Sequence, residues 1–390
     1  MFDRPESGDA AILVGIDFGT RAVSALDFAE RFEEFELLCK NAGLRVQATV
    51  KAKRAKADPA LFIGSGKATE IKEMLVGHPN SVVLFNHALS PAQERNLERA
   101  LGCRVIDRAS LILDIFAQRA KSHEGKVQVE LAQLEHLSTR LVRGWTHLER
   151  QRGGIGLRGP GETQLETDRR LLGVRVKVLR EKLKKLQRQR DVQRRARSRR
   201  DILSVSIVGY TNAGKSTLFN ALTHAGSYAA DKLFATLDTT TRRVYLPAAG
   251  NVTVSDTVGF IRDLPHGLVA AFRATLEETV QADILVHVVD ASSPGRAQQI
   301  EQVNQVLTEI GAADTPQILL FNKIDLTDIQ PGIDRDECGS IARIRMSAKT
   351  GLGIEHLRDA ITEMAASRSS LKLLNTTIDP TLPEVGNSYV

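Results

Sequence analysis

The chain has 390 residues, of which 42% are hydrophobic, and a formal net charge of +6. This length predicts two or three domains with real cores, and the positive charge favours an anionic partner if the excess is concentrated in one region. The three cysteines are far apart, the N-terminus is acidic and no apolar run is long enough to span a bilayer, so we exclude a disulfide framework and membrane insertion and expect a cytoplasmic protein.

Residues 1–115 alternate short strand patterns with helix patterns. The strand patterns are Ile12–Ile16, Val46–Val50, Val82–Phe85 and Arg104–Ile106, and the helix patterns cover residues 29–41 and 90–101. They predict a small α/β domain with a largely parallel sheet. The turn Gly64–Lys67 resembles a phosphate loop without its spacing, so it indicates either a simple helix start or a second phosphate or RNA contact.

Residues 116–200 contain no strand pattern. Apolar residues with one polar gap repeat at helical spacing at Val127, Leu131, Leu134, Ser138, Leu141, Trp145 and Leu148, and again at Leu172, Val176, Leu179, Leu183 and Leu186. Two such seams joined by one loop predict an antiparallel helical hairpin, or coiled coil; ordinary core helices of a globular bundle are the alternative.

The loop that joins the two helices, Gln151–Glu162, contains five glycines and a proline together with Arg152 and Arg158. A positive, flexible tip of this kind suits a narrow RNA crevice, although a merely permissive connection has the same composition. The second helix then carries a basic run, Arg175 to Arg200, in which only Glu181 and Asp191 are acidic. Since a solvated helix face normally interleaves its charges, this run favours contact with backbone phosphates of a polyanion.

The stretch Gly209–Ser216 fits the phosphate-loop pattern GxxxxGK[ST] between a short apolar strand, Val205–Val208, and a helix that opens at Thr217. Glycines let backbone N–H groups surround phosphate oxygens, and the helix N-terminus adds unpaired donors. Lys215 is expected to bind the outer phosphates and Ser216 to place a hydroxyl on Mg²⁺. The alternative is a glycine-rich turn that matches the pattern by chance, and the downstream motifs of the chain argue against it.

Four further elements occur after this loop in the order that a GTPase requires. Asp256–Gly259 matches DxxG, with Asp256 holding the Mg²⁺ shell through water and the Gly259 N–H sensing the γ-phosphate. The segment Leu233–Asp238 occupies the place of the first switch loop, and we choose Thr236 as its metal ligand, with Thr239 to Thr241 as rivals.

The last two elements concern the base. Asn322–Asp325 matches NKxD, and the Asp325 carboxylate can accept two hydrogen bonds from guanine that adenine cannot supply. Ser347–Lys349 matches the loop whose backbone contacts the guanine oxygen. We therefore predict that the chain is a GTPase, with Lys215, Thr236 and Gly259 as catalytic residues and Ser216 and Thr236 as metal ligands. The residues predicted to bind the nucleotide are Gly209, Tyr210, Thr211, Asn212, Ala213, Gly214, Lys215, Ser216, Thr217, Phe234, Ala235, Thr236, Leu237, Asp238, Asp256, Thr257, Val258, Gly259, Asn322, Lys323, Asp325, Ser347, Ala348 and Lys349.

Phe260 stands where a Ras-like GTPase has its water-orienting glutamine, so we predict slow intrinsic hydrolysis that a partner accelerates. Asn212 is a candidate ligand for a monovalent cation such as K⁺, although asparagine also suits such a loop for backbone reasons.

The chain resembles the HflX family of translation-associated GTPases. The resemblance is carried by Ser90–Leu97, Ile112–Arg119, Gly153–Glu166, Gly209–Asn220 and Asp256–Ile261. It implies a GTPase that binds the large ribosomal subunit and its rRNA with the hairpin loop near the peptidyl-transferase centre, and that splits stalled or idle ribosomes during stress. It also implies Mg²⁺ ligation by Ser216 and Thr236, and a hydrophobic residue in place of the catalytic glutamine, as at Phe260.

This organisation places an N-terminal α/β domain at residues 1–115, the hairpin at 116–200, a P-loop GTPase domain with a mostly parallel sheet at 201–367, and a short irregular tail at 368–390. Many family members carry a further domain after the GTPase domain, and we expect this tail to be too short to form one. Two alternatives stay open: a GTPase that acts in ribosome assembly or rRNA maturation, and a nucleotide-gated binding module for a protein partner.

Overall fold

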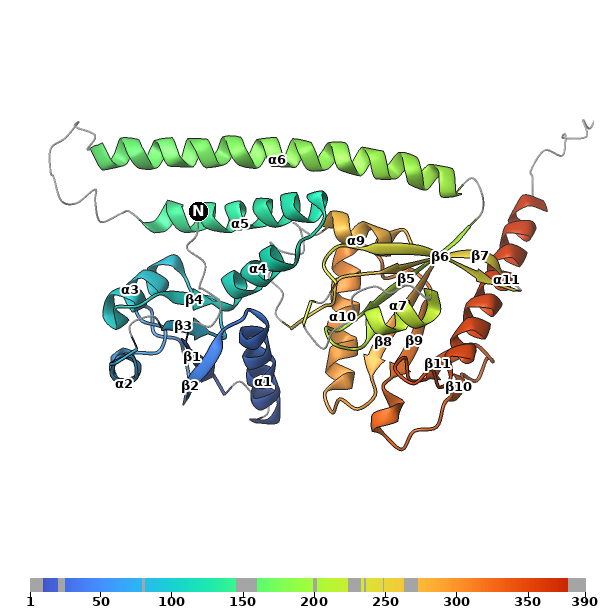
Figure 1. Cartoon of the computed structure of the whole chain (residues 1–390), viewed down its shortest axis with the longest axis horizontal. Helices are drawn as coiled ribbons and strands as arrows, with labels where there is room; N and C mark the ends of the chain where they lie inside the picture. The colour runs from blue at the N-terminus through green and yellow to red at the C-terminus, as the bar shows by residue number, and fades with distance from the viewer. Residues whose placement is uncertain are drawn as a thin grey trace, which may run out of the picture.

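The computed structural model describes residues 10–19, 25–78, 81–144, 160–198, 202–223, 233–234, 236–247, 249–262 and 273–377. Two α/β domains lie side by side, and a long helical hairpin extends along them (Figure 1). No helix in these described ranges is both long and apolar enough to cross a lipid bilayer.

The first domain has the parallel sheet that the alternation of patterns predicts. Its strands are β1 (Ala10–Asp17), β2 (Arg45–Lys53), β3 (Val82–Phe85) and β4 (Val105–Asp107), and its helices are α1 (Ala25–Asn41), α2 (Ser65–Met74), α3 (Pro91–Leu101) and α4 (Arg108–Arg119). The sheet order is β2-β1-β3-β4 with every pair parallel. Helix α3 begins as expected, because the Ser90 hydroxyl accepts the Gln93 N–H and the Gln93 side chain accepts the Ser90 N–H.

Helix α4 crosses the domain boundary that we placed at residue 115. It begins at the Asp107 cap, whose carboxylate accepts the Ser110 N–H at 2.9 Å, and continues to Arg119 because no proline or glycine interrupts it. Its residues from Leu111 to Phe116 are buried, so α4 joins the first domain to its neighbours rather than ending before them.

Helices α5 (His123–Gly144) and α6 (Pro160–Ser198) form the predicted antiparallel hairpin (Figure 1). The buried seam consists of Val127, Leu131 and Leu179, with Leu134, Val176 and Leu183 packed against it. The other face of α5 is also buried, since Val129 and Ala132 belong to the core beneath. Helix α5 is therefore both hairpin arm and core helix, whereas α6 is held by one seam. Trp145, Leu148 and the glycine-rich tip to Gly159 lie outside the described residues.

The second α/β domain has a mixed, mostly parallel sheet in the order β10-β11-β9-β8-β5-β7-β6. Its strands are β5 (Leu203–Gly209), β6 (Thr240–Leu246), β7 (Gly250–Asp256), β8 (Ile284–Asp290), β9 (Gln317–Asn322), β10 (Gly332–Arg335) and β11 (Ile341–Arg345), and its helices are α7 (Lys215–Thr223), α9 (Arg273–Val280), α10 (Arg296–Ile310), the short 3-10 turn η1 (Ile324–Leu326) and α11 (Ile354–Thr377). Only the edge pairs β6·β7 and β10·β11 are antiparallel.

Helix α11 runs to Thr377, so the irregular tail that we expected from residue 368 is helical in its first part. The physical reason lies in the sequence, because no glycine or proline occurs between Ile354 and Thr377. The residues after Thr377 lie outside those described.

One hydrophobic core is continuous across the boundary between the two α/β domains. It contains Phe35 of α1, Phe116 of α4 and Val129 of α5 together with Phe234 and Phe260 of the second domain. The Phe116 and Phe234 rings meet edge to face at 4.6 Å between centroids. The two domains therefore share buried surface and are not joined by a flexible linker alone.

The buried histidine of β8 gives the folded protein a predictable sensitivity to acid. Burial lowers the pKa of His287 to about 4, from an ordinary value of 6.5. In the unfolded chain this histidine becomes protonated as the pH falls through about 6.5, whereas in the folded chain it stays neutral until the pH is near 4. The free energy of unfolding therefore decreases as the pH falls through this window, by up to about 3 kcal/mol. Urea unfolding of H287Q from pH 7 to 4.5 should show a shallower loss than the wild type. The matched variant H356Q, at a less buried histidine, should keep the wild-type slope; equal slopes in all three proteins would contradict the assignment.

Candidate nucleotide site

The phosphate loop connects the end of β5 to the first residue of α7, as its motif predicts. Gly209 has φ of 144° and Gly214 has φ of 93°, both in the region that favours glycine. A Cβ at Gly209 would collide with the Val288 carbonyl of β8, and one at Gly214 would collide with the Asn322 amide. The loop is therefore pressed against two neighbouring strand ends, and both glycines are required sterically.

Lys215 is buried at the floor of this loop, with its side chain folded back. Its Nζ donates a hydrogen bond to the Tyr210 carbonyl at 2.7 Å. Burial lowers the pKa of Lys215, the charge of Asp256 opposes this and that of Lys323 adds to it, and the resulting pKa is about 8. An ammonium with so little anionic compensation is suited to receive phosphate oxygens.

Three oxygen-bearing side chains from separate segments meet next to Lys215. Ser216 Oγ lies 2.7 Å from Thr236 Oγ1, and both hydroxyls lie within 2.8 Å of Asp256 Oδ2. The other carboxylate oxygen, Asp256 Oδ1, is buried and has no hydrogen-bond partner among the described residues. Burial raises the pKa of Asp256. Two hydroxyls and a carboxylate with an unused oxygen are a donor set that fits Mg²⁺, which prefers oxygen ligands and retains several waters.

Two of the three rival threonines lie in a strand. Thr240 and Thr241 belong to β6, and Thr241 Oγ1 lies 2.9 Å from Ser255 Oγ. Thr236 Oγ1 contacts both Ser216 and Asp256, so the geometry favours it among the candidates that the sequence left open.

Hydrogen bonds tie the loops that are predicted to bind the base to the phosphate loop. Asn322 donates from Nδ2 to the Ala213 carbonyl and accepts the Ala348 N–H, both at 2.8 Å, so it ties the phosphate loop to the loop containing Ser347 and Lys349. Lys323 has φ of 63° and forms an ion pair with Asp290 at 2.7 Å. Asp325 is exposed, and Ser347 donates to one of its carboxylate oxygens at 2.6 Å. This arrangement leaves the Asp325 carboxylate oriented and open to solvent.

Phe260 is buried with 3% of its surface exposed, and its ring belongs to the core shared with the first domain. Its N–H donates to the Gly209 carbonyl at 3.1 Å, and its carbonyl accepts the Thr211 N–H at 2.7 Å. A Cβ at the preceding Gly259 would lie 2.9 Å from Lys215 Nζ. The DxxG segment thus lies against the phosphate loop. The residue that follows it, Phe260, carries a phenyl ring and no polar group that could hold water.

Asn212 occupies the left-handed region with φ of 60° and is exposed. Asparagine tolerates this conformation better than most residues, which supports the backbone explanation for its presence. Its role as a K⁺ ligand stays a prediction.

Some residues that we assigned to the nucleotide turn their side chains elsewhere. The ring of Phe234 and the side chain of Leu237 are buried in the shared core, and the Asp238 carboxylate binds the start of α5. The reason is tertiary: this part of the switch loop lies against α4 and α5, which the motif alone does not reveal. Ala235 lies outside the described residues.

A buried polar network that carries no sequence motif joins this site to the first domain. Tyr210 donates its hydroxyl proton to Glu34 of α1 and accepts the Arg262 N–H at 2.8 Å. Arg108 of α4 donates to Glu34 at 3.0 Å and to the Arg262 carbonyl at 3.1 Å. The Arg262 guanidinium contacts Glu30 of α1 at 3.1 Å. Burial, and then the charge of Glu34, raises the pKa of Tyr210. Sequence reasoning missed Glu34, Arg108 and Arg262, because the contacts of this network join residues 52 to 232 positions apart.

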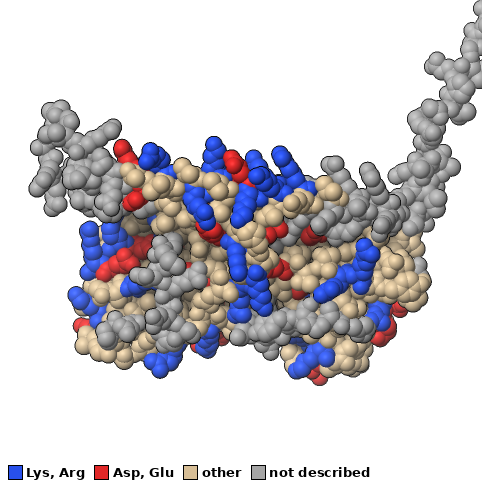
Figure 2. Space-filling view, turned by 45° about the horizontal axis from the view of Figure 1, so that its top comes forward, with Lys and Arg blue, Asp and Glu red and all other residues tan. Residues whose placement is uncertain are grey.

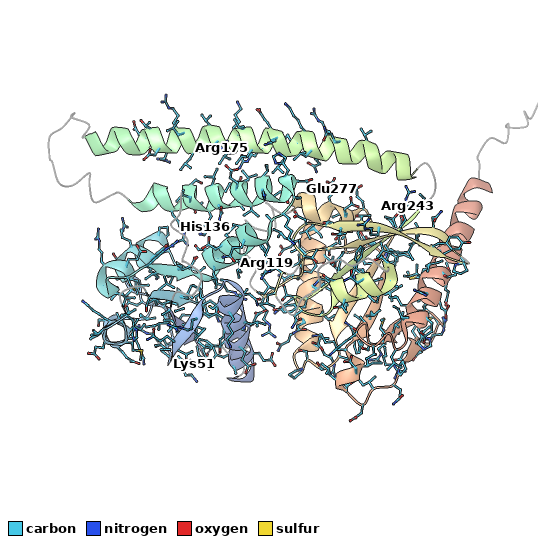
Figure 3. The ribbon with its side chains drawn as sticks, in the orientation of Figure 1. Lys51, Arg119, His136, Arg175, Arg243 and Glu277 are labelled. Atoms are coloured by element: carbon cyan, nitrogen blue, oxygen red, sulfur yellow. The ribbon has the colours of Figure 1, made fainter. Side chains whose placement is uncertain are left out.

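The basic helix α6 is less one-sided than its own sequence indicates. Arg175 and Arg180 pair with Glu130 and Glu135 of α5 at 2.6 and 2.7 Å, so part of the missing counter-charge comes from the neighbouring helix. Figure 3 shows Arg175 on α6, which runs along α5. The remaining charge is solvent-facing, and Figure 2 shows Lys and Arg side chains along this side of the molecule. In the run that begins at Arg175, the exposed basic residues outside these two pairs with described side chains are Lys177, Lys182, Lys184, Lys185 and Arg188. Arg152 and Arg158 lie outside the described residues.

Three protein families match successive parts of the chain. Residues 29–117 match the family described as GTP-binding GTPase N-terminal, residues 119–197 match GTP-binding GTPase middle region, and residues 204–323 match 50S ribosome-binding GTPase. Among solved structures, the GDP complex of the protein SsGBP is 25% identical with a TM-score of 0.50, and the match covers 93% of this chain and 99% of that one.

Full-length relatives extend the same result. The chain is 57% identical over 364 residues to GTPase HflX of Escherichia coli strain K12, which covers 93% of this chain and 84% of the relative. It is 47% identical over 354 residues to GTPase HflX of Caldanaerobacter subterraneus subsp. tengcongensis, which covers 90% of this chain and 80% of that protein. Identity at this level over nearly the whole length shows that the chain belongs to the HflX family of GTPases.

Proposed function

We propose that this protein hydrolyses GTP with Mg²⁺, slowly by itself and faster on the large ribosomal subunit, and that it dissociates stalled or idle ribosomes under stress. The observation that carries the first part is the convergence of Ser216, Thr236 and Asp256 within 2.8 Å of one another beside Lys215. Three segments of a GTPase domain meet there, and each brings the group that its motif predicts.

The residues have separate tasks in this proposal. Lys215 and the phosphate-loop N–H groups bind the phosphates, and the Gly259 N–H contacts the outermost one. Ser216 and Thr236 would hold Mg²⁺, and Asp256 would contact the ion through water. When bound, the ion would neutralise charge that develops on the phosphates. Asp325 selects guanine by accepting from its N1–H and exocyclic amine.

The low basal rate is attributed to Phe260. Hydrolysis requires an attacking water that is held in line, and a buried phenyl ring cannot accept or donate a hydrogen bond to it. A partner must therefore supply the positioning or rearrange the DxxG segment. The large subunit is proposed as that partner, because the match to the ribosome-binding family and the exposed basic residues of α6 both favour an RNA-rich surface.

Guanine selection can be tested by exchanging one hydrogen-bonding pattern for another. D325N should weaken GDP binding at least ~100-fold, because two charge-assisted hydrogen bonds are lost, and should improve binding of xanthosine diphosphate, whose C2 carbonyl can accept from the new amide. Titration with fluorescent nucleotides measures both affinities. D328N makes the same charge change three residues away and should bind GDP normally. Unaltered GDP affinity in D325N would remove Asp325 from the site.

The role of the basic helix can be separated from general charge. In the double variant K184Q/K185Q, two exposed charges are lost, and the slope of log affinity for large subunits against log salt should decrease by about 2. R175Q/R180Q removes equal charge from the same helix, but at residues already paired with Glu130 and Glu135, and should change the slope less. Co-sedimentation at several salt concentrations provides the slopes, and the reverse ranking would argue against phosphate contacts on this face.

Ribosome splitting can be tested by removing residues 153–161. The deletion should leave the basal GTPase rate unchanged, since these residues lie outside the GTPase domain, and should abolish stimulation by large subunits and dissociation of 70S particles in density gradients. The wild type should bind large subunits more tightly with a non-hydrolysable GTP analogue than with GDP. Splitting that survives the deletion would refute the role of the tip, and accumulation of precursor subunits in a deletion strain would favour an assembly role instead.

A further inference from the structure

The side chain of Asp238, from the first switch segment, binds the residues that lead into the first helix of the hairpin. Its Oδ2 accepts the backbone N–H groups of Lys121 at 2.9 Å and Ser122 at 2.7 Å, and its Oδ1 accepts the Ser122 hydroxyl at 2.5 Å. The Ser122 Oγ in turn accepts the Gly125 N–H at 2.9 Å. Asp238 thus binds the two residues that precede α5 from 116 residues away in the chain, and Ser122, which it holds, satisfies the N–H of Gly125 in the first turn.

Gly125 gives this carboxylate its place. A Cβ built on Gly125 would collide with Asp238 Oδ1. Glycine is the least favourable helix residue apart from proline, so a glycine in the first turn of α5 weakens the helix by itself. The close approach of Asp238 supplies a physical reason for it. In contrast, a Cβ on Gly173 of α6 would meet nothing within 4 Å.

The segment that ends in Asp238 is held at its other end as well. Phe234 packs edge to face on Phe116 of α4, with 4.6 Å between ring centroids. Between these two anchors lies Thr236, whose hydroxyl is 2.7 Å from Ser216 Oγ and 2.8 Å from Asp256 Oδ2. Leu237, the residue that connects Thr236 to Asp238, is buried with 3% exposure. A two-residue step spans at most ~7 Å, so the anchored Asp238 and the buried Leu237 limit how far Thr236 can move from Ser216 and Asp256.

We propose that Asp238 is a positioning residue: by binding the start of hairpin helix α5, it holds Thr236 where Thr236 ligates Mg²⁺ with bound GTP. This inference rests on the proposed Mg²⁺–GTP site and adds the hairpin base as a structural part of it. Coupling of this kind is reciprocal, so Mg²⁺–GTP stabilises the first turn of α5, and a partner that displaces α5 weakens Mg²⁺–GTP binding. The hairpin that is proposed to contact RNA is then connected to the metal site by one side chain.

The contact can be broken from either side. D238A removes the carboxylate from the switch segment, whereas G125A displaces it from the hairpin while improving the helix propensity of α5. Both variants should raise the Mg²⁺ concentration needed for half-maximal binding of a non-hydrolysable GTP analogue at least ~5-fold. Both should bind GDP in EDTA as the wild type does. G173A makes the same substitution in the other hairpin helix and should match the wild type in each measurement.

The double variant D238A/G125A provides the sharpest readout. Once the carboxylate is absent, the collision of the new methyl group with Asp238 is removed and a tight contact with Ser122 Oγ at 3.1 Å is left, so the double variant should behave like D238A alone rather than show the sum of two defects. Hydrogen exchange of the first turn of α5 should slow on addition of Mg²⁺ and analogue in the wild type and not in D238A.

The outcomes are distinct. Wild-type Mg²⁺ dependence in both D238A and G125A, with thermal unfolding showing that they are folded, would overturn the positioning role while leaving the GTP site intact. Additive defects in the double variant would also overturn it, because G125A would then act by another route. Failure of the wild type to bind either the analogue or GDP would instead overturn the proposed function, and this inference with it.

Discussion

The burial of switch-segment side chains in the core of another domain is the constraint on which the rest of this structure depends. Phe234 lies two residues before Thr236, and Phe260 directly follows Gly259. Both rings nevertheless lie in one core with Phe116 of α4 and Phe35 of α1. Burying such a side chain is worth about 1.5–3 kcal/mol. The switch segments of an isolated GTPase domain can move at little cost, whereas here their movement exposes apolar surface between two domains.

The polar network around Tyr210 adds direction to this apolar contact. Apolar packing alone tolerates sliding, but the Tyr210 hydroxyl, Glu34, Arg108 and the Arg262 backbone satisfy one another in a single arrangement. Removing one partner of a buried charged pair costs about 3–5 kcal/mol because the other charge is left uncompensated. The network therefore fixes one orientation of the first domain on the phosphate loop, and it does so through Tyr210, whose carbonyl also holds Lys215.

The sequence was sufficient wherever local spacing determines geometry. The places of Lys215 and Ser216 at the start of α7 and of Asp256 at the end of β7 follow from the fixed register of strand, loop and helix, and the hairpin seam around Leu179 follows from helical periodicity. It failed where partners are distant. The local pattern does not predict that the Asp238 carboxylate binds Ser122 or that Arg175 pairs with Glu130, and Arg262 belongs to no motif. The ends of α4 and α11 differ from the prediction for a local reason, because no glycine or proline interrupts either helix.

These energies support the proposal that a partner accelerates hydrolysis. A hydrogen bond from the Gly259 N–H to a phosphate is worth about 1.5–3 kcal/mol, which is the same size as the burial of the adjacent Phe260 ring. Neither term dominates, so the position of the DxxG segment is set by nucleotide and domain interface together. A ligand shifts such an equilibrium only by its differential affinity for the two arrangements. A glutamine at position 260 would orient water but would leave a polar group in the shared core, so the residue that joins the domains cannot also be the one that activates water.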